Sequence, residues 1–429
     1  MIKTKNNGYR RRFDMTVREQ VEAANQKVLD IFTKARPIWR DVRPAIEVIP
    51  GMKKNLVLIP GPPIAPEDLP IPLKTAVSGA AVHEGLAKDL EEAWEMVIRK
   101  EIEVDAAQNY NCSNAASMAT SASMPVFVVT DETSGGTGFC TIHPGASPRV
   151  LRWGIYGPDV EENLSWLRDE FGPILGDAVR RSGGIDLISL LSKTAGMGDE
   201  NHNRQPASSM AMALALIPWM LEVEHPKVKE NVAWLAANDR FSLQPLMAGI
   251  EGIMSSAKQV PYSTVMVGMG GNGIEFGIQV AATGNRWYTT KAPLILGTFL
   301  KPTTTKADLL GYLGDSCVTE VWGLGGMGAI AGPTYAKLTG STFEDARERT
   351  ERARKVSLGE HSFDPVPWDN YRGTPVCVDI RKVVAYGVLP ISHGGSGLKT
   401  GGQAGAGACE LPLECFKKAL IGVGEAVIR

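Results

Sequence analysis

The chain has 429 residues, of which 44% are hydrophobic and 21% are charged, and its formal net charge at pH 7 is −2. A chain of this length exceeds one compact core, so we expect two or three domains. The near-neutral charge gives no electrostatic argument for binding nucleic acid or an anionic membrane. The longest apolar run, residues 210–221, is too short to cross a bilayer and predicts a buried helix.

The N-terminal segment and the cysteines point to a cytoplasmic protein. Residues 1–12 are basic, but no apolar segment follows them, so we expect no secretory signal. The six cysteines are scattered and form no C-x-x-C pair. This usage favours reduced thiols over a disulfide framework, and it argues against a zinc site built on thiolates.

The first third of the chain predicts alternating helices and strands. Residues 17–33 carry one apolar face at helical spacing, and residues 75–103 are mostly helical in pattern. Residues 55–59 and 125–129 are short apolar runs that predict strands. An amide- and hydroxyl-rich segment, residues 108–123, precedes the second of them.

The middle of the chain predicts helices. Asp159 is placed to cap a helix with one apolar face, and residues 185–191, 210–221 and 226–238 continue in helical style. Strands return after residue 260, at 263–267, 293–296, 317–322 and 375–379, and a terminal helix closes the chain. We therefore expect a mixed α/β (α+β) multidomain fold. Its three parts would be an N-terminal α/β domain over 1–157, a helical domain over 158–260 and a glycine-rich α/β domain over 261–429.

One dense polar stretch, residues 196–204, abuts the longest apolar run and is the first place to expect a site. If Asp199 opens the next helix, unpaired backbone N–H groups at that helix end would suit an anionic ligand. The alternative is a helix cap with ordinary surface polarity, but capping needs only one polar side chain. The candidate catalytic residues are Asp199, Glu200, His202, Asn203 and Arg204.

Glycine-rich segments follow the predicted strands and invite a dinucleotide interpretation. The segment 323–328 has the G-x-G-x-x-G spacing, but it lies late in the chain, and no acidic residue follows a clean second strand. Structural turns are the better interpretation. A G-x-x-x-x-G-K-[ST] loop is absent, so ATP hydrolysis of that type is not supported.

Polar residues accompany these glycine segments, and we expect several loops to converge with residues 199–204 on one pocket. Arg149 and Arg152 would clamp a carboxylate or phosphate, with a surface salt bridge as an equally weighted alternative. The candidate substrate-binding residues are Asn111, Arg149, Arg152, Asn272, Glu275, Asp315, Thr319, Glu320, His393, Lys399 and Gln403.

No nucleophile stands out in the sequence. Cys112 and Ser123 lie in polar surroundings, but neither has a neighbouring base in sequence. Acyl transfer without a covalent intermediate needs a general base and an oxyanion pocket. His202 or Glu200 would serve as the base, and Arg204 with backbone N–H groups would stabilise the oxyanion.

Several motifs follow one another in order along nearly the whole chain. They include S-M-P-V-F-V-V (123–129), M-G-D-E-x-H-N-R (197–204), N-G-x-E-F-G (272–277), G-D-S-x-x-T-E (314–320) and G-Q-x-G-A-G (402–407). These motifs resemble those of a bacterial family, the AllG/YahG-like proteins, which includes a subunit of oxamate carbamoyltransferase. The resemblance implies two mixed α/β domains with a small helical domain between them. It also implies an oligomeric or multi-subunit cytoplasmic enzyme of ureide or purine nitrogen breakdown.

The reaction implied by this resemblance is phosphorolysis of an N-carbamoyl compound such as oxalurate, giving carbamoyl phosphate and an amide. Arg152 and the loop with Lys399 would hold phosphate or a carboxylate, and residues 199–204 would activate the carbamoyl group. The hydrogen bonds to the amide nitrogens would come from Asn272, Glu275, Asp315 and Glu320.

Two other functions stay open. An amidohydrolase would use water in place of phosphate, and a non-catalytic subunit would only present substrate to partner subunits, in a homo-oligomer or hetero-oligomer. We expect no cofactor and rank a metal-free site above a divalent metal held by carboxylates. Those carboxylates would be Asp199, Glu200, Asp315 and Glu320.

Overall fold

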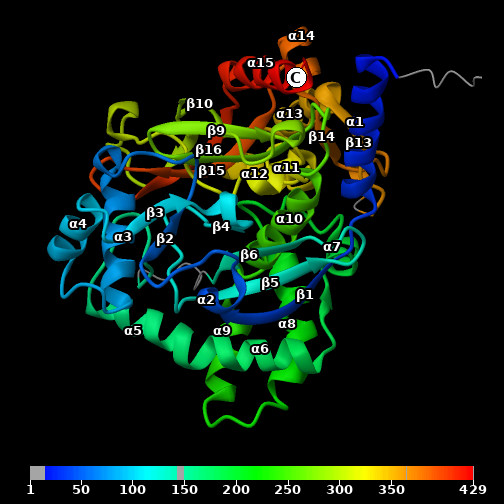
Figure 1. Ribbon diagram of the computed structural model, residues 1–429. Coiled ribbons are helices and arrows are strands. Elements are labelled where there is room, and N and C mark those ends of the chain that lie inside the picture. Colours follow the sequence, from blue (N-terminus) through cyan, green and yellow to red (C-terminus); the bar gives the residue numbers. More distant parts are fainter. Residues whose placement is uncertain (1–14, 143–148, 364, 429) are drawn as a thin grey trace, which may run out of the picture.

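The computed structural model describes residues 15–142, 149–363 and 365–428, drawn as a coloured ribbon in Figure 1. It confirms the expected mixed α/β fold, with helices and several separate sheets. The basic N-terminal segment, residues 1–12, lies outside the described residues. None of the described helices is long and apolar enough to cross a membrane.

The first sheet has five strands in the order β4-β6-β5-β1-β7. Its central strands β6, β5 and β1 pair antiparallel, while β4 pairs parallel with β6. The apolar run predicted as a strand at residues 125–129 is confirmed as β5. The strands are β1 (Pro37–Pro44), β4 (Cys112–Ser113), β5 (Pro125–Asp131), β6 (Thr137–Thr141) and β7 (Ile185–Asp186).

A smaller unit stands beside this sheet. Two parallel strands, β2 (Leu56–Ile59) and β3 (Glu103–Ala106), pair with each other, and α3 (Ile71–His83) packs against β2 and α4 (Leu90–Ile98). Leu73 and Val77 of α3 belong to a core cluster separate from the main one. The predicted helical stretch over 75–103 is thus two helices and the start of a strand.

Helices dominate residues 158–257, as the sequence predicts, with corrections at their ends. Asp159 lies in the first turn of α5, whose N-cap is Gly157, and Ile185 begins a short strand where a helix was predicted. The main apolar core draws on residues from all three predicted domains, and their boundaries stay a prediction. The helices are α5 (Pro158–Trp166), α6 (Gly172–Arg181), α7 (Leu187–Thr194), α8 (Pro206–Met220), α9 (Val228–Ala237) and α10 (Leu243–Ala257), with a π-helical turn over Leu167–Phe171.

Three further sheets form the C-terminal part, in the orders β10-β9-β8-β12, β11-β16-β15 and β13-β14. All the neighbouring pairs in these sheets are antiparallel. The strands are β8 (Met266–Asn272), β9 (Glu275–Val280), β10 (Tyr288–Lys291), β11 (Leu296–Phe299), β12 (Leu313–Gly314), β13 (Ser357–Glu360), β14 (Pro375–Val378), β15 (Ile391–Gly397) and β16 (Gln403–Glu410).

The remaining helices frame these sheets. The N-terminal helix is confirmed at its predicted bounds and is stabilised by a capping box between Thr16 and Glu19. The helices are α1 (Val17–Thr33), α2 (Ala45–Val48), α11 (Val318–Val321), α12 (Pro333–Leu338), α13 (Phe343–Val356), α14 (Ile380–Tyr386) and α15 (Leu413–Ile428), with 3-10 turns at Pro66–Asp68, Ala107–Tyr110, Ala281–Thr283, Lys306–Asp308, Ala329–Ala331 and Pro367–Asp369.

The glycine-rich segments differ most from expectation. Glycines 268–271 lie inside strand β8, and residues 394–407 run through the β15–β16 hairpin, where loops were predicted. The run 317–322, interpreted as a strand, contains helix α11. Gly270 shows why glycine is needed in β8, because a Cβ there would lie 2.5 Å from Oδ1 of Asp315. The glycines allow tight packing, which hides the alternation that normally marks a strand.

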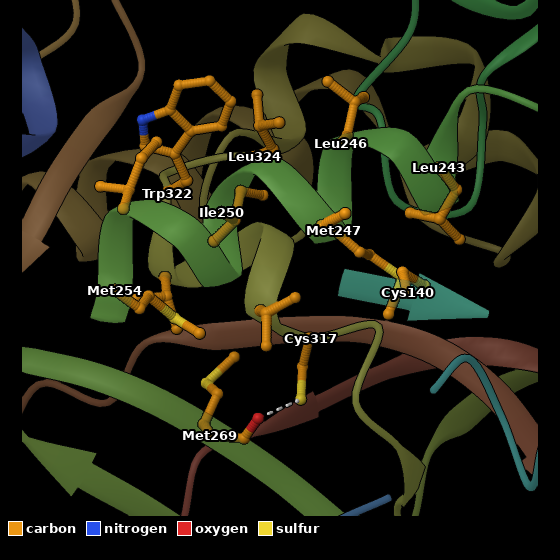
Figure 2. Packing of buried hydrophobic residues seen from close by; sticks show 14 of the residues in the cluster. Cys140, Leu243, Leu246, Met247, Ile250, Met254, Met269, Cys317, Trp322 and Leu324 are labelled. Carbon is orange, nitrogen blue, oxygen red and sulfur yellow. Dashed lines mark hydrogen bonds between the residues drawn. The ribbon is translucent and has the colours of Figure 1, made fainter. Parts of the chain in front are cut away.

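Helix α10 is the buried axis of the molecule. It contacts β5 and β6 of the first sheet on one side and α11 and β8 of the C-terminal part on another, and in Figure 1 it crosses the centre between these layers. Figure 2 shows its Leu246, Met247 and Ile250 packed in the core, near Cys317, whose thiol donates to the Met269 carbonyl at 3.3 Å. All six cysteines are buried and unbridged.

Candidate functional site

A cavity of about 70 Å³ lies where several loops meet beside the N-terminal ends of α8 and α10. At roughly 10–15 Å³ per water-sized space, it has room for a polar ligand of only a few heavy atoms. The positive ends of two helix dipoles favour an anionic ligand there. Its lining residues are Ala115, Ala116, Arg152, Trp153, His202, Asn203, Gln205, Arg240, Leu243, Gln244, Tyr312, Leu313, Ser316, Gly394, Gly395 and Gln403.

A chain of hydrogen bonds runs from the cavity wall into the core through His202. Its Nε2 lies 2.8 Å from Oγ of Ser316, which is half-buried and lines the cavity. Its Nδ1 lies 2.9 and 3.0 Å from the two carboxylate oxygens of Glu320. The His202 and Glu320 side chains are only 2% and 0% exposed, so the exposed end of this chain is the serine hydroxyl.

The environment of His202 sets its protonation. Burial by itself disfavours the imidazolium, but the charge and hydrogen bonds of Glu320, together with the charge of Glu200, outweigh it, and the pKa of His202 is raised above its ordinary value of 6.5. His202 therefore keeps its proton to a higher pH than an ordinary histidine does.

The carboxylate of Glu320 is held by a glycine loop. Its Oε1 accepts the backbone N–H groups of Gly326 and His393, each at 2.9 Å, and its Oε2 accepts the hydroxyl of Thr319 at 2.9 Å. Gly325 has a φ of +56°, and a Cβ there would lie 2.3 Å from Glu320 Oε1. The G-x-G-x-x-G spacing of residues 323–328 thus lets the backbone wrap a protein carboxylate, in accord with a structural turn.

A second histidine–carboxylate pair lies behind the first. Nδ1 of His393 is 3.1 Å from Oε2 of Glu200, and its Nε2 is 3.1 Å from a guanidinium nitrogen of Arg349. A guanidinium only donates hydrogen bonds, so Nε2 accepts and the proton of His393 sits on Nδ1. The two contacts together fix the orientation of the His393 ring.

Two buried amide oxygens and an indole N–H are left without hydrogen-bond partners in the described structure. They are Oε1 of Gln205, Oε1 of Gln244 and Nε1 of Trp153, and all three residues line the cavity. The amide of Gln205 is oriented because its nitrogen donates to the His202 carbonyl. Buried polar groups are normally satisfied, so these atoms indicate a ligand with both N–H donors and oxygen acceptors.

Two positively charged side chains also line the cavity. Arg152 and Arg240 both line the cavity, and burial followed by the charge of Arg240 lowers the pKa of Arg152 to about 10. Arg152 still carries its charge at neutral pH. Trp153, next in the chain, has a φ of +54°, which is unusual for a bulky residue and marks a locally constrained backbone.

The predicted catalytic stretch enters the cavity only in part. His202 and Asn203 line it, whereas Glu200 turns inward and accepts the backbone N–H groups of Asn203 and Arg204, both at 2.6 Å. Arg204 donates through Nε to the Gly198 carbonyl at 3.1 Å. Of the five candidate side chains, two line the cavity, whereas Asp199, Glu200 and Arg204 do not.

Asp199 needs a specific correction. It does not open the next helix, since α8 begins at Pro206. Its Oδ2 accepts the backbone N–H of Ser208 at 2.9 Å, in the first turn of α8. A carboxylate of the chain itself thus occupies a donor that we had expected to bind an anionic ligand. Burial, partly offset by the Ser208 hydrogen bond, leaves the pKa of Asp199 raised.

Most of the candidate substrate-binding residues serve the fold. Asn272 closes the β8–β9 turn by accepting the Glu275 N–H at 2.8 Å, and Thr289 donates to Glu275. Asn111 has a φ of +54° in the turn before β4. Lys399 is exposed and donates to the Ala307 carbonyl at 2.8 Å.

Two further candidates, Arg149 and Asp315, are not among the residues that line the cavity. Arg149 is paired with Glu162 on the surface, in accord with the salt-bridge alternative. Asp315 is fully buried and accepts from Gly61 N, Gln108 Nε2 and Asn114 N at 2.8, 2.7 and 3.2 Å. Burial, partly offset by these hydrogen bonds, raises the pKa of Asp315 to about 7. Among the predicted substrate-binding residues, Arg152 and Gln403 line the cavity.

The candidate site residues selected from the sequence did not include Ser316, Gln205, Gln244, Trp153 or Arg240, which all line the cavity. Ser316 stands inside the polar stretch 314–320 whose neighbours were selected, so its position carried a signal. The other four adjoin helix starts or follow Arg152, and no pattern of residue types marks them. The four carboxylates considered for a metal have separate partners, and the described residues contain no group of three or more His, Cys, Asp or Glu that could hold a metal ion.

Comparisons with known proteins agree on one family. The model of the family described as oxamate carbamoyltransferase subunit AllG matches residues 102–316. The chain is 34% identical to an uncharacterized protein, YahG of Escherichia coli K12, over 95% of this chain and 87% of that protein. It is 33% identical to oxamate carbamoyltransferase subunit AllG of the same organism, over 95% of this chain and 98% of that protein.

A solved structure supports the fold. The crystal structure of a conserved protein of unknown function from Enterococcus faecalis V583 superposes with a TM-score of 0.93 at 32% sequence identity. The match covers 96% of this chain and 100% of that one. The arrangement of sheets and helices is therefore shared across nearly the whole length.

Proposed function

This chain belongs to the AllG family, and we propose from that premise that it forms the carbamoyl-binding site of a carbamoyltransferase. The reaction is transfer of a carbamoyl group between a small N-carbamoyl compound, such as oxalurate, and phosphate, giving carbamoyl phosphate and an amide. Since its relative AllG is named as a subunit, we propose that the chain works in a complex with partner subunits.

The observation that carries this proposal is the pairing of cations with unpartnered amide oxygens in one small cavity. A carbamoyl group ends in an NH₂ that needs acceptors, and Oε1 of Gln205 and Oε1 of Gln244 supply them. The phosphate or the substrate carboxylate is an anion, and Arg152 and Arg240 supply the charge. The N–H of Trp153 would donate to an oxygen of the ligand.

The test is a thermal-shift titration of the purified chain with carbamoyl phosphate, phosphate, oxamate and oxalurate. A ligand that binds only the folded state stabilises it by about 2.7 kcal/mol at roughly 100 times its Kd. We expect carbamoyl phosphate to raise Tm, and Arg152→Ala to abolish the shift. Arg149→Ala is the matched control, since it removes an equal charge three positions away and outside this cavity.

Two results would contradict the proposal. One is that no carbamoyl compound binds the chain or a complex reconstituted with partner subunits. The other is that Arg149→Ala weakens binding as much as Arg152→Ala does.

An amidohydrolase is the second candidate, because the linked Ser316, His202 and Glu320 also suit attack by water on an amide. The two functions differ in their need for phosphate. A carbamoyltransferase forms carbamoyl phosphate and stalls without phosphate, whereas a hydrolase releases its amide product at the same rate in phosphate-free buffer.

A further inference from the structure

We propose that Ser316 is a nucleophile that carries the carbamoyl group as a carbamate ester during transfer. His202 acts as its general base and acid, and Glu320 holds the imidazole in position. This inference rests on the proposed function and adds to it a covalent step, which makes the reaction two successive transfers through one enzyme oxygen.

The geometry is that of an activated serine. Oγ of Ser316 lies 2.8 Å from Nε2 of His202, and Nδ1 of the same ring lies 2.9 Å from Glu320. Nucleophile, base and orienting carboxylate are thus linked in order, which defines such a triad whatever the spacing in sequence. Ser316 is the member that lines the cavity and is half-buried, so a ligand in the cavity can reach it.

Other candidate nucleophiles lack one of these features. The hydroxyl of Tyr312 also lines the cavity, but it donates to the His393 carbonyl at 2.8 Å. The thiols of Cys112 and Cys317 are fully buried, and burial raises their pKa. Ser123 Oγ donates to Glu84 at 2.9 Å, outside the cavity. Among the cavity-lining residues described, Ser316 is the hydroxyl that contacts an imidazole.

The first half-reaction forms the ester. Oγ of Ser316 attacks the carbamoyl carbon while Nε2 of His202 takes the hydroxyl proton. The bond from that carbon to the leaving amide nitrogen then breaks, and His202 gives its proton to this nitrogen. With oxalurate as substrate, the leaving product is oxamate, and the serine holds an O–CO–NH₂ group. The acceptors on Gln205 and Gln244 are placed to orient its NH₂.

The second half-reaction regenerates the serine. An oxygen of hydrogen phosphate attacks the ester carbon and passes its proton to His202. The bond from the carbon to Oγ of Ser316 breaks, and His202 returns the proton to Oγ. The product is carbamoyl phosphate, so atoms, electrons and protons balance without any further reactant.

The experiment uses the intact chain and 4-nitrophenyl carbamate, an activated carbamoyl donor that needs no partner subunit. We expect a burst of about one 4-nitrophenolate per chain and a single carbamoyl adduct mapped to Ser316 by peptide mass spectrometry. Ser316→Ala abolishes the burst and the adduct. The matched control is Ser189→Ala, at an exposed position of α7, which keeps both. An unchanged Tm and unchanged carbamoyl phosphate binding show that Ser316→Ala is folded.

The outcomes separate this inference from the proposed function. No adduct on the wild-type chain, an adduct that persists in Ser316→Ala, or unchanged turnover of a reconstituted complex carrying Ser316→Ala overturns the nucleophile. Phosphate-dependent turnover of oxalurate in that complex would still support the proposed function. A specific burst on Ser316 with no binding of carbamoyl phosphate and no phosphate-dependent turnover would support the nucleophile and reject carbamoyl transfer to phosphate.

Discussion

Two histidine–glutamate pairs lie side by side in this molecule, and they differ in one contact. His202 and His393 are both buried, and each bonds a buried glutamate through Nδ1, at 2.9 Å to Glu320 and 3.1 Å to Glu200. At Nε2, His202 meets the hydroxyl of Ser316, whereas His393 meets the guanidinium of Arg349. The group that contacts Nε2 therefore decides whether each imidazole can exchange a proton with a ligand.

A hydroxyl gives and accepts a proton, so His202 is able to gain and lose one during a reaction. A guanidinium only donates hydrogen bonds, so Arg349 occupies Nε2 of His393 and blocks the same use of that nitrogen. His393 instead fixes Glu200, which in turn binds the backbone of Asn203 at the cavity wall. In the proposed mechanism, the first pair transfers protons, and the second supports the loop that carries His202.

The largest expected effect is on His202. We expect His202→Asn to lower turnover of the reconstituted complex by about 10²–10⁴-fold, the usual contribution of a general acid–base residue. The loss should appear in kcat, with the affinity for carbamoyl phosphate largely kept. His393→Asn is the comparison, and it should leave kcat within about tenfold. Equal losses of kcat in both variants would remove the distinction between the pairs.

Variants of the two glutamates, Glu320 and Glu200, test the same difference between the pairs. Glu320→Gln keeps the size of the side chain but removes the charge that holds His202, and we expect turnover to fall by about 100-fold or more. Glu200→Gln should act mainly on stability, by about 1–3 kcal/mol, because a buried hydrogen-bond acceptor is weakened. Steady-state rates and thermal unfolding of both variants check this, and the reverse pattern would show that the roles are exchanged.

A variant of Arg349 tests the pair formed by His393 and Glu200, because Arg349 contacts His393. Arg349→Met leaves Nε2 of His393 without a donor, and we expect a loss of about 1–3 kcal/mol in the free energy of unfolding. Arg352→Met, on the same helix, removes a surface pair with Glu410 and should cost less than about 1 kcal/mol. Thermal unfolding of the two variants measures the difference. Equal losses would mean that the contact with His393 stabilises nothing.

The smallest effect is the pH dependence. Because His202 must be neutral to act as a base, the burst rate should rise with pH through its raised pKa, at a midpoint above 6.5. In Glu320→Gln the midpoint should move down. The sign for stability is opposite: protonated His202 stabilises the fold below its unfolded pKa, and this contribution is lost as the pH rises through the folded pKa. A burst rate independent of pH between 5 and 9 would contradict this assignment.

Local structure was largely predictable from the sequence, and the site was predictable only in outline. Helix α1 was found at its bounds because its apolar spacing and capping residues act locally. A strand was predicted at 263–267, but β8 runs over Met266–Asn272. Its glycine stretch was predicted as a loop because the neighbour that requires Gly270, Asp315, is distant in sequence. In the stretch 196–204, residue types indicated a site, but the burial of Asp199 and Glu200 depends on α8 and His393, far away in sequence.

The link between His202 and Ser316 shows the same limit, since 114 positions separate them. Each residue lies in a polar stretch that the sequence marks, but nothing in the sequence links the two stretches. His202 lies in the loop before α8 and Ser316 in the loop before α11, and only the tertiary fold brings them within hydrogen-bond distance. The chemistry of the cavity is thus a property of contacts across the chain, which no local pattern records.

The burial of every cysteine has a practical consequence for following this cavity in solution. Burial raises the pKa of all six thiols, so alkylating reagents find no ready thiolate on the folded chain. Ser316→Cys would place one thiol against His202, whose imidazolium favours the thiolate. A fluorescent maleimide would then label the cavity alone, and its protection by a bound ligand would report occupancy directly in the native protein.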